Sequence, residues 1–293
     1  MSYKIKNKKQ FHKQFRKRLL NQVDAAIQEI QDGSMPFDKK IHQARKRFKK
    51  IRGLLRLGMK TLGKKRYKEE NSRFREYGHR LAHARDSNVY LKTLNSVAED
   101  SVDKRKIKGL KQALEEEYNH ARHTVLEKDV LKNLAKDLQK NRAVYLEMPL
   151  KKLGNKAFVK GLTRVLSRGE KAFKNVQTQP TPENFHELRK RVKYLWYHMR
   201  LLKKSNRQVN GAYAHILDNL SDNLGDAHDL SLLENRLKKE KVAGNKKQIN
   251  VLQKGIHRKN ERLRRKSIKK SRGIFIEPDD AFIERQLIFW NDK

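Results

Sequence analysis

The sequence has 293 residues and no cysteine, and its 72 Lys and Arg residues against 33 Asp and Glu residues give a formal net charge of +39. The lack of cysteine excludes disulfides, thiolate zinc sites and cysteine nucleophiles. So large a positive charge repels itself in a compact fold, which favours a polyanionic partner over a merely basic, soluble protein. The N-terminal residues lack the apolar core of a signal peptide, and no stretch approaches the roughly 18 apolar residues of a membrane span. We therefore expect a cytoplasmic protein with no membrane partner.

Apolar residues recur at intervals of three and four, and strand-like alternation is almost absent, so the predicted fold class is all-α. In chain order, the helices predicted for the first half cover residues 8–31, 38–62, 65–84, 87–100 and 103–140. Those predicted for the second half cover residues 155–177, 183–204, 207–225, 229–241 and 245–270. Helices of this kind bury their apolar faces only by packing on one another, which predicts helical bundles.

Several residues predict where helices begin. Asp38 can cap the second predicted helix, and Thr181 can cap a later one because Pro182 follows it at the first helical position. Asp86 and Asp229 each precede a predicted helix, and both are expected to act as N-caps.

The chain is expected to divide near residues 148–155, where MPLKKLGN interrupts the helical pattern. This division predicts a first bundle over residues 1–148 and a second over residues 149–272. The aromatic segment 273–293 follows. We expect it to dock on the bundles, with binding to a partner helix as the alternative.

One basic helix occurs twice, 144 positions apart. IHQARKRFKKIRGLLRL begins at Ile41, and FHELRKRVKYLWYHMRL begins at Phe185. On a helical wheel, the basic residues of each copy share one arc and the apolar residues lie opposite. The first arc holds His42, Arg45, Lys46, Lys49, Arg52 and Arg56, and the second holds His186, Arg189, Lys190, Lys193, Tyr197 and Arg200.

The residue types on these arcs suit phosphate. A solvated helix face normally mixes charges, because Glu–Lys pairs stabilise it and like charges at i and i+4 destabilise it. Arg grips phosphate oxygens with a planar fork, Lys adds a mobile charge, and protonated His donates from both ring nitrogens. We interpret the two arcs as a binding face. Two further candidate contacts belong to the turn LAHARDSNVYL, which begins at Leu81: Arg85 lies within it and Arg80 directly precedes it. LGDAHDLSLL repeats this turn but has His228 in place of Arg85.

The HQARKRFKKIR and HELRKRVKYLW helices and their LxxxRD and LGDAHD turns resemble the CHAD domain, a histidine-containing α-helical domain, over about residues 8–270. The resemblance implies two antiparallel four-helix-type bundles related by an internal pseudo-two-fold repeat. It also implies that inorganic polyphosphate binds in a basic groove between them, and that the protein associates with polyphosphate granules or polyphosphate-handling proteins. By this likeness the groove is lined by His42, Arg45, Lys46, Lys49, His186, Arg189, Lys190 and Lys193.

The first alternative is a DNA- or RNA-binding protein, since a high isoelectric point and a basic stripe are typical of that class too. Base stacking needs aromatic residues on the positive face, but in this sequence Tyr197 is nearly alone there.

The second alternative is a polyphosphate-processing enzyme, but the sequence has no GxxxxGK[ST] phosphate loop and no nucleophile with a base beside it. A helical stripe of acids suggests Mg²⁺, although neutralisation of neighbouring basic helices explains it better. The stripe consists of Asp218, Asp222, Asp226 and Asp229. His79 and His83 have zinc-helix spacing without the HExxH pattern. We expect neither a cofactor nor a metal, and a binding protein rather than an enzyme.

Two properties follow from the polyphosphate hypothesis. Each phosphate contact releases counterions, so affinity should fall steeply with salt. Protonation of His42 and His186 should strengthen binding, which predicts tighter binding near pH 6 than near pH 8.

Overall fold

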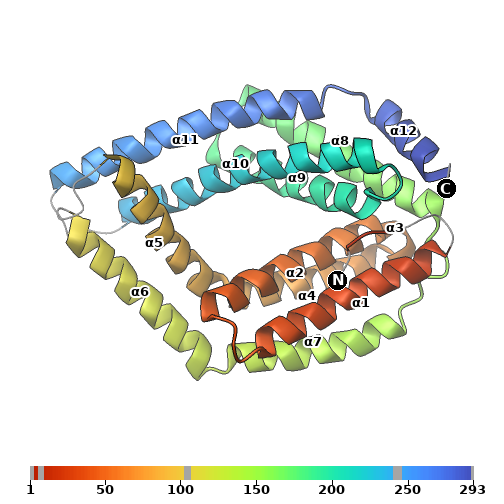
Figure 1. The fold of residues 1–293 in the computed structure, drawn as a ribbon, viewed down its shortest axis with the longest axis horizontal. Coiled ribbons are helices and arrows are strands. Elements are labelled where there is room, and N and C mark those ends of the chain that lie inside the picture. Colours follow the sequence, from red (N-terminus) through yellow and green to blue (C-terminus); the bar gives the residue numbers. More distant parts are fainter. Residues whose placement is uncertain (1–2, 6–9, 102–106, 240–245, 292–293) are drawn as a thin grey trace.

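The computed structural model describes residues 3–5, 10–101, 107–239 and 246–291, and the elements within these ranges are α-helices (Figure 1). The predicted all-α fold class is therefore confirmed for the described part of the chain. The division into domains at 1–148 and 149–272 and the pseudo-two-fold relation between the halves stay predictions.

The first half contains two groups of packed helices. Helix α1 packs against α2 and α7, α2 also packs against α4, and α5 packs against α6. The bounds are α1 (Phe11–Gln31), α2 (Phe37–Leu57), α3 (Met59–Leu62), α4 (Lys64–Arg80), α5 (Ala82–Ser101), α6 (Lys108–Glu127) and α7 (Val130–Leu146).

In the second half, α9 packs between α8 and α10, α10 packs along α11, and α12 packs on α8. The bounds are α8 (Asn155–Thr178), α9 (Pro182–Leu202), α10 (Arg207–Lys239), α11 (Lys246–Ile274) and α12 (Asp279–Asn291).

Two hydrophobic clusters join the halves. The larger cluster takes residues from both halves and from α12, whose Trp290 ring stacks on Phe158 at a centroid distance of 5.2 Å. The aromatic C-terminal segment is thus docked on the chain itself. The smaller cluster joins α5 and α6 to α10 and α11, and it includes Leu94 and Leu233. In Figure 1, α5 and α6 lie toward the left, and α2 and α9 run through the middle of the molecule.

Of the predicted caps, Thr181 is confirmed, because its hydroxyl accepts a hydrogen bond from the backbone N–H of Asn184 at 3.2 Å. Asp38 is not an N-cap, and that prediction is wrong. Pro36 occupies the cap position of α2, and Asp38 lies in the first turn. There its carboxylate accepts a hydrogen bond from the hydroxyl of Tyr118 at 2.8 Å.

The predictions that Asp86 and Asp229 are N-caps are also wrong, because both lie inside helices. α5 begins four residues before Asp86, and α10 continues without a break through the predicted boundary at Gly225. A glycine inside a helix costs about 1 kcal/mol relative to alanine, which packing can offset. Here the Gly225 position lies against the side chain of Arg189. Both aspartates bind Arg85 instead.

Two further predicted helices are divided in the structure. The helix predicted over 103–140 is two helices, which meet at Asp129 in the left-handed region (φ 48°) that aspartate tolerates better than most residues. α2 ends before Gly58, and the short α3 follows it. The predicted helix boundaries at residues 103, 241 and 245 lie outside the described residues.

Candidate polyanion-binding site

α2 and α9, which carry the repeated basic motif, cross near their C-terminal ends. Gly53 lies at this crossing, where a Cβ atom would be in ordinary van der Waals contact with the ring of Tyr197, at 3.5 Å. The Nε2–H of His198 donates to the carbonyl oxygen of Gly53 at 3.0 Å. Beside the crossing, the N–H of Ile5 donates to the carbonyl oxygen of Leu201 at 2.9 Å, which holds the N-terminal segment on α9.

On the N-terminal side of this crossing the two helices line a cavity of about 660 Å³ together with α5 and α10, here called the central cavity. α2, α5 and α9 supply its basic and aromatic side chains, which are His42, Arg45, Lys46, Lys49, Arg85, Arg189, Lys193, Trp196, Tyr197 and Arg200. α10 supplies a polar and acidic wall of Asp218, Ser221, Asp222, Gly225, Asp226 and Asp229. Seven Lys and Arg side chains thus face four Asp side chains.

Nine of the fourteen predicted site residues line this cavity, and five do not. Three of the five turn to other partners. Arg52 donates to an asparagine side chain of α4 at 3.1 Å. Arg56 is buried with its guanidinium 4.2 Å above the ring of Tyr194. Arg80 forms an ion pair with Asp137 at 2.9 Å.

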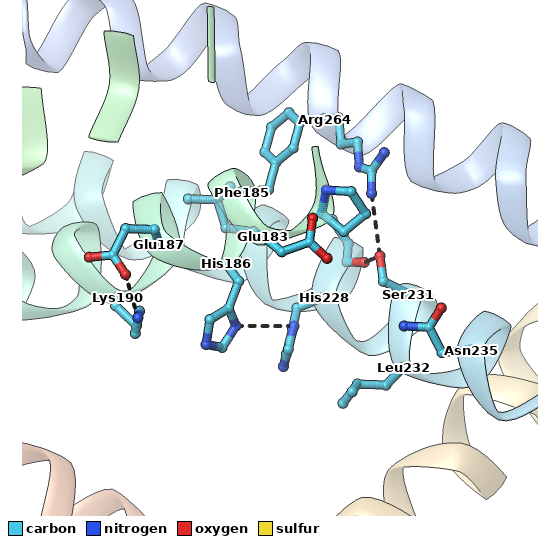
Figure 2. A pocket seen from close by; sticks show the side chains of 13 residues that line it. Glu183, Phe185, His186, Glu187, Lys190, His228, Ser231, Leu232, Asn235 and Arg264 are labelled. Carbon is cyan, nitrogen blue, oxygen red and sulfur yellow. Dashed lines mark hydrogen bonds and ion pairs between the residues drawn. The ribbon is translucent and has the colours of Figure 1, made fainter. Parts of the chain in front are cut away.

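The other two, His186 and Lys190, line a separate pocket of about 480 Å³ between α9, α10 and α11 (Figure 2). The Nδ1 atom of His186 lies 3.3 Å from the Nδ1 atom of His228, so one ring must donate and the other accept. Lys190 forms an ion pair with Glu187. His228 stands where the first copy of the turn has Arg85, so this substitution supplies the partner toward which His186 turns.

Arg85 is the best-anchored cation of the central cavity. Its guanidinium binds the carboxylates of Asp86 at 2.9 Å and Asp229 at 3.0 Å, which come from matching positions of the two turns. Burial opposes its charge, but these two carboxylates raise the pKa of Arg85 above its usual value. Asp229 of the acidic wall therefore helps to orient a cation of α5.

The lysines of the cavity experience an excess of positive charge. Burial lowers the pKa of Lys49 well below its usual range, and the charges of Arg189 and Arg45 lower it further. Burial and Arg189 also lower the pKa of Lys193, although Asp222 opposes this. An anion that enters the cavity would stabilise the charged form of both lysines.

The histidines show the same effect. Burial, followed by the charges of Lys46 and Lys49, lowers the pKa of His42. Burial and the neighbouring Lys190 lower the pKa of His186. Burial, Arg189 and His186 together lower the pKa of His228 to about 3. The rings are therefore neutral at pH 7 without a ligand, and an anion would favour their protonation.

Two buried donors in the cavity have no hydrogen-bond partner among the described residues. They are the Nε–H of Arg189 and the hydroxyl of Ser221. A buried unsatisfied donor is costly to the folded state.

Trp196 was not among the predicted site residues, yet it lines the cavity and two cations stack on its ring. The Nζ atom of Lys193 lies 4.3 Å from the ring centroid, and the guanidinium carbon of Arg200 lies 4.7 Å from it. The signal was present, since Trp196 follows Lys193 by three positions and precedes Arg200 by four, which places all three on one side of a helix. An electron-rich ring here holds both cations in place.

The acids of α10 were interpreted as neutralising partners, and the ion pair of Asp229 with Arg85 agrees with that. Among the described residues, no three His, Asp or Glu side chains gather in a way that could hold a metal ion. None of the described helices combines the length and apolar character needed to cross a membrane.

The chain matches the model of one known protein family. The CHAD domain model matches residues 14–238, and the chain belongs to the CHAD domain family. This family is associated with polyphosphate binding and generally acts as a binding or structural module. No curated protein matches the chain. The match covers the whole central cavity, whereas α11 and α12 lie beyond it.

Proposed function

We propose that this protein binds inorganic polyphosphate in the central cavity. The observation that carries the proposal is the convergence of seven Lys and Arg side chains from α2, α5 and α9 on one cavity. Burial and the neighbouring positive charges lower the pKa of Lys49, so the charged cavity is unfavourable without a ligand. Membership of the CHAD domain family supports the same ligand.

The mechanism is charge neutralisation by preformed donors. Arg45 and Arg189 present guanidinium forks from opposite helices, and Lys49 and Lys193 lie one helical turn beyond them. Arg85 is already oriented by Asp86 and Asp229. A polymer of identical phosphate units can contact both helices at once, and each contact releases counterions.

The cavity favours a bare phosphate chain over a nucleic acid. Sequence-tolerant binding of single strands relies on several aromatic side chains that stack on successive bases. Trp196 and Tyr197 are the aromatic residues that line this cavity, and Tyr197 is fully buried. Nucleic acid therefore serves as the competitor in the test below.

The proposed activity is binding rather than catalysis, and the proposal requires no cofactor. A protein that holds polyphosphate in the cytoplasm would accumulate at polyphosphate granules and meet polyphosphate-handling proteins there. These locations and partners are consequences of the proposal and are tested after it.

The test measures binding of labelled polyphosphate at about physiological salt, with double-stranded DNA and RNA as competitors at equal phosphate concentration. The cavity variant carries R45A, K49A, R189A and K193A. The matched control carries K64Q, K65Q, K68Q and R75Q, four exposed cations on the mixed-charge face of α4 that remove the same net charge.

We expect the cavity variant to lose at least about a hundredfold in affinity, since charge-assisted hydrogen bonds contribute about 1.5–3 kcal/mol each. It should also show a shallower dependence on salt. The control should lose about threefold or less by general electrostatics. Circular dichroism establishes that all variants stay helical. Equal losses in the two variants, or stronger competition by nucleic acid than by unlabelled polyphosphate, would contradict the proposal.

A further inference from the structure

Most of the excess positive charge lies outside the central cavity. The cavity holds seven Lys and Arg against four Asp, whereas the chain carries a net charge of +39. α11 alone has twelve Lys and Arg residues and a single acid, Glu261. Because α11 begins after the last residue of the family match, its charge needs an explanation of its own.

The cations of α11 gather on its outward face. The inward face contacts α10, α5 and α8 and buries Ile256, Asn260, Ser267 and Ser271. The opposite face carries eight exposed cations, here called the α11 stripe, which are Lys254, Arg258, Arg262, Arg265, Lys266, Lys269, Lys270 and Arg272. The stripe is about 27 Å long at a rise of 1.5 Å per residue. It follows the outer edge of the molecule (Figure 1).

No acid interrupts the α11 stripe. Glu261 is half-buried and binds Arg264 at 3.2 Å, and Arg264 lies on the inward side, over the ring of Phe185. Within the described residues, none of the eight stripe cations forms an ion pair. By contrast, the exposed face of α10 includes Asp222 and Asp226. Like charges three and four residues apart destabilise a helix by a few tenths of a kcal/mol each, a cost that a bound polyanion would remove.

The chemistry of the stripe selects a ligand that needs only charge. Lys254 to Arg272 presents no exposed aromatic ring for base stacking and no exposed large apolar side chain for insertion into a membrane. A flexible chain of phosphates can follow a straight row of cations without either.

We propose that the α11 stripe is a second polyphosphate-binding site, so that one molecule holds polyphosphate at two places. This inference rests on the proposed function of the central cavity, from which α10 separates the stripe. A chain long enough to reach both sites would gain affinity through the high local concentration of its free part. Where the two sites take different chains, the protein crosslinks polyphosphate.

The test compares a stripe variant with the α4 control K64Q/K65Q/K68Q/R75Q, which loses the same charge. The stripe variant carries R258Q, R262Q, R265Q and K269Q. Tripolyphosphate is the short probe, and a chain of at least about 100 phosphates is the long probe. We expect the stripe variant to keep its affinity for tripolyphosphate within about twofold and to bind the long chain about tenfold more weakly than the control does. Turbidity of protein mixed with the long chain should fall as well.

The inference is overturned if the stripe variant and the control bind the long chain equally. It is also overturned if the stripe variant loses binding to double-stranded DNA or to anionic phosphatidylserine vesicles while it keeps the long polyphosphate. The cavity variant R45A/K49A/R189A/K193A separates this question from the proposed function. Retention of tripolyphosphate by that variant would refute the cavity proposal, whereas the comparison of stripe variant and control decides the second site.

Discussion

α2 and α9 carry the same basic motif, yet the fold gives the two copies different surroundings. His42 of α2 lines the central cavity, whereas its counterpart His186 turns to His228 in a separate pocket. The cause is a neighbouring helix. α5 brings Arg85 near α2, and α10 brings His228 to α9. A repeated motif therefore specifies the helix, while the helices packed against it decide which of its side chains reach the ligand.

Gln43 of α2 and Glu187 of α9 are a second matching pair with different surroundings. Gln43 precedes Lys46 in α2, and Lys46 lines the cavity. At the matching position α9 has Glu187, which forms ion pairs with both Lys190 and Arg191. Because α9 has an acid where α2 has an amide, Lys190 is held in an ion pair, whereas Lys46 has no acid at the matching position.

The largest difference concerns the helix crossing, where α9 has His198 and α2 has Leu54. His198 is fully buried, and burial lowers its pKa to about 4 from the usual value near 6.5. Between pH 4 and pH 6.5, the unfolded chain therefore binds a proton at His198 that the folded protein does not bind. The free energy of unfolding is highest above pH 6.5 and falls as the pH drops toward 4, by about 3 kcal/mol from this residue.

His198→Leu gives α9 the residue that α2 has, so it should remove this loss. Urea unfolding at pH 7, 6, 5 and 4 measures the free energy of unfolding of both proteins. As the pH falls, the stability of the wild type should decrease relative to that of the variant. Loss of the hydrogen bond to Gly53 adds an offset that does not depend on pH. His257→Leu, at an exposed position, is the control. A gap that stays constant from pH 7 to pH 4 would rule out a buried neutral His198.

The second prediction uses adjacent residues of one helix. Arg189→Ala should weaken polyphosphate binding by about tenfold to a hundredfold, because it removes a charge-assisted contact in the cavity. Lys190→Ala should cost about twofold or less, since Lys190 lies in the other pocket and binds Glu187. In α2 both Arg45→Ala and Lys46→Ala should weaken binding. Titration of labelled polyphosphate compares the four variants, and equal effects of Arg189→Ala and Lys190→Ala would contradict the placement.

The local features of the fold could be predicted from the sequence. Helical periodicity is a property of neighbouring residues, so the helices and their apolar faces follow from it. The cap at Thr181 is local too, because one hydroxyl and the following proline suffice. Eight of the predicted site residues reach the cavity for the same reason, since one arc of α2 and one arc of α9 point to one side.

The predictions that were wrong concern features that depend on contacts between segments distant in the sequence. Gly225 predicts a helix end, but packing against Arg189 keeps α10 continuous. Arg52 and Arg56 share an arc with Lys49 on the helical wheel, yet they lie where α2 passes its crossing with α9, and they turn to other helices. No local pattern in α2 encodes the position of that crossing.

The third prediction concerns the pH dependence of binding. Burial and the cations Lys46 and Lys49 hold the pKa of His42 below its usual value in the free protein. A bound polyanion raises that pKa, so binding takes up a proton in the range between the free and bound values. Affinity should therefore increase as pH falls from 8 to 6, by at most tenfold for each unit by which binding raises the pKa of His42.

The two histidines should contribute unequally. His42→Ala should remove most of this pH dependence and His186→Ala less, because His186 faces His228 rather than the cavity. Binding is measured at pH 6, 7 and 8 at constant ionic strength. A double variant H42A/H186A that keeps the pH dependence of wild type would show that Lys49 or another group carries it.

The smallest effect should come from exchange of the residues that differ between the motifs. Glu187→Gln gives α9 the amide that α2 has, which frees Lys190 and removes a negative charge near Arg189. We expect affinity for polyphosphate to rise about twofold, because ion pairs at such exposed positions contribute only about 0–1 kcal/mol. Gln43→Glu should lower it by a similar factor.

Glu69→Gln, an exposed residue of α4, removes the same charge far from either pocket and is the control. Net charge alone would make Glu69→Gln and Glu187→Gln equally effective, whereas the local account requires a larger effect of Glu187→Gln. The reverse change Gln43→Glu should lower the affinity for polyphosphate, because an acid in α2 would lie close to Lys46, which lines the cavity. Opposite effects of these two substitutions would show that a single acid makes the second motif the weaker partner.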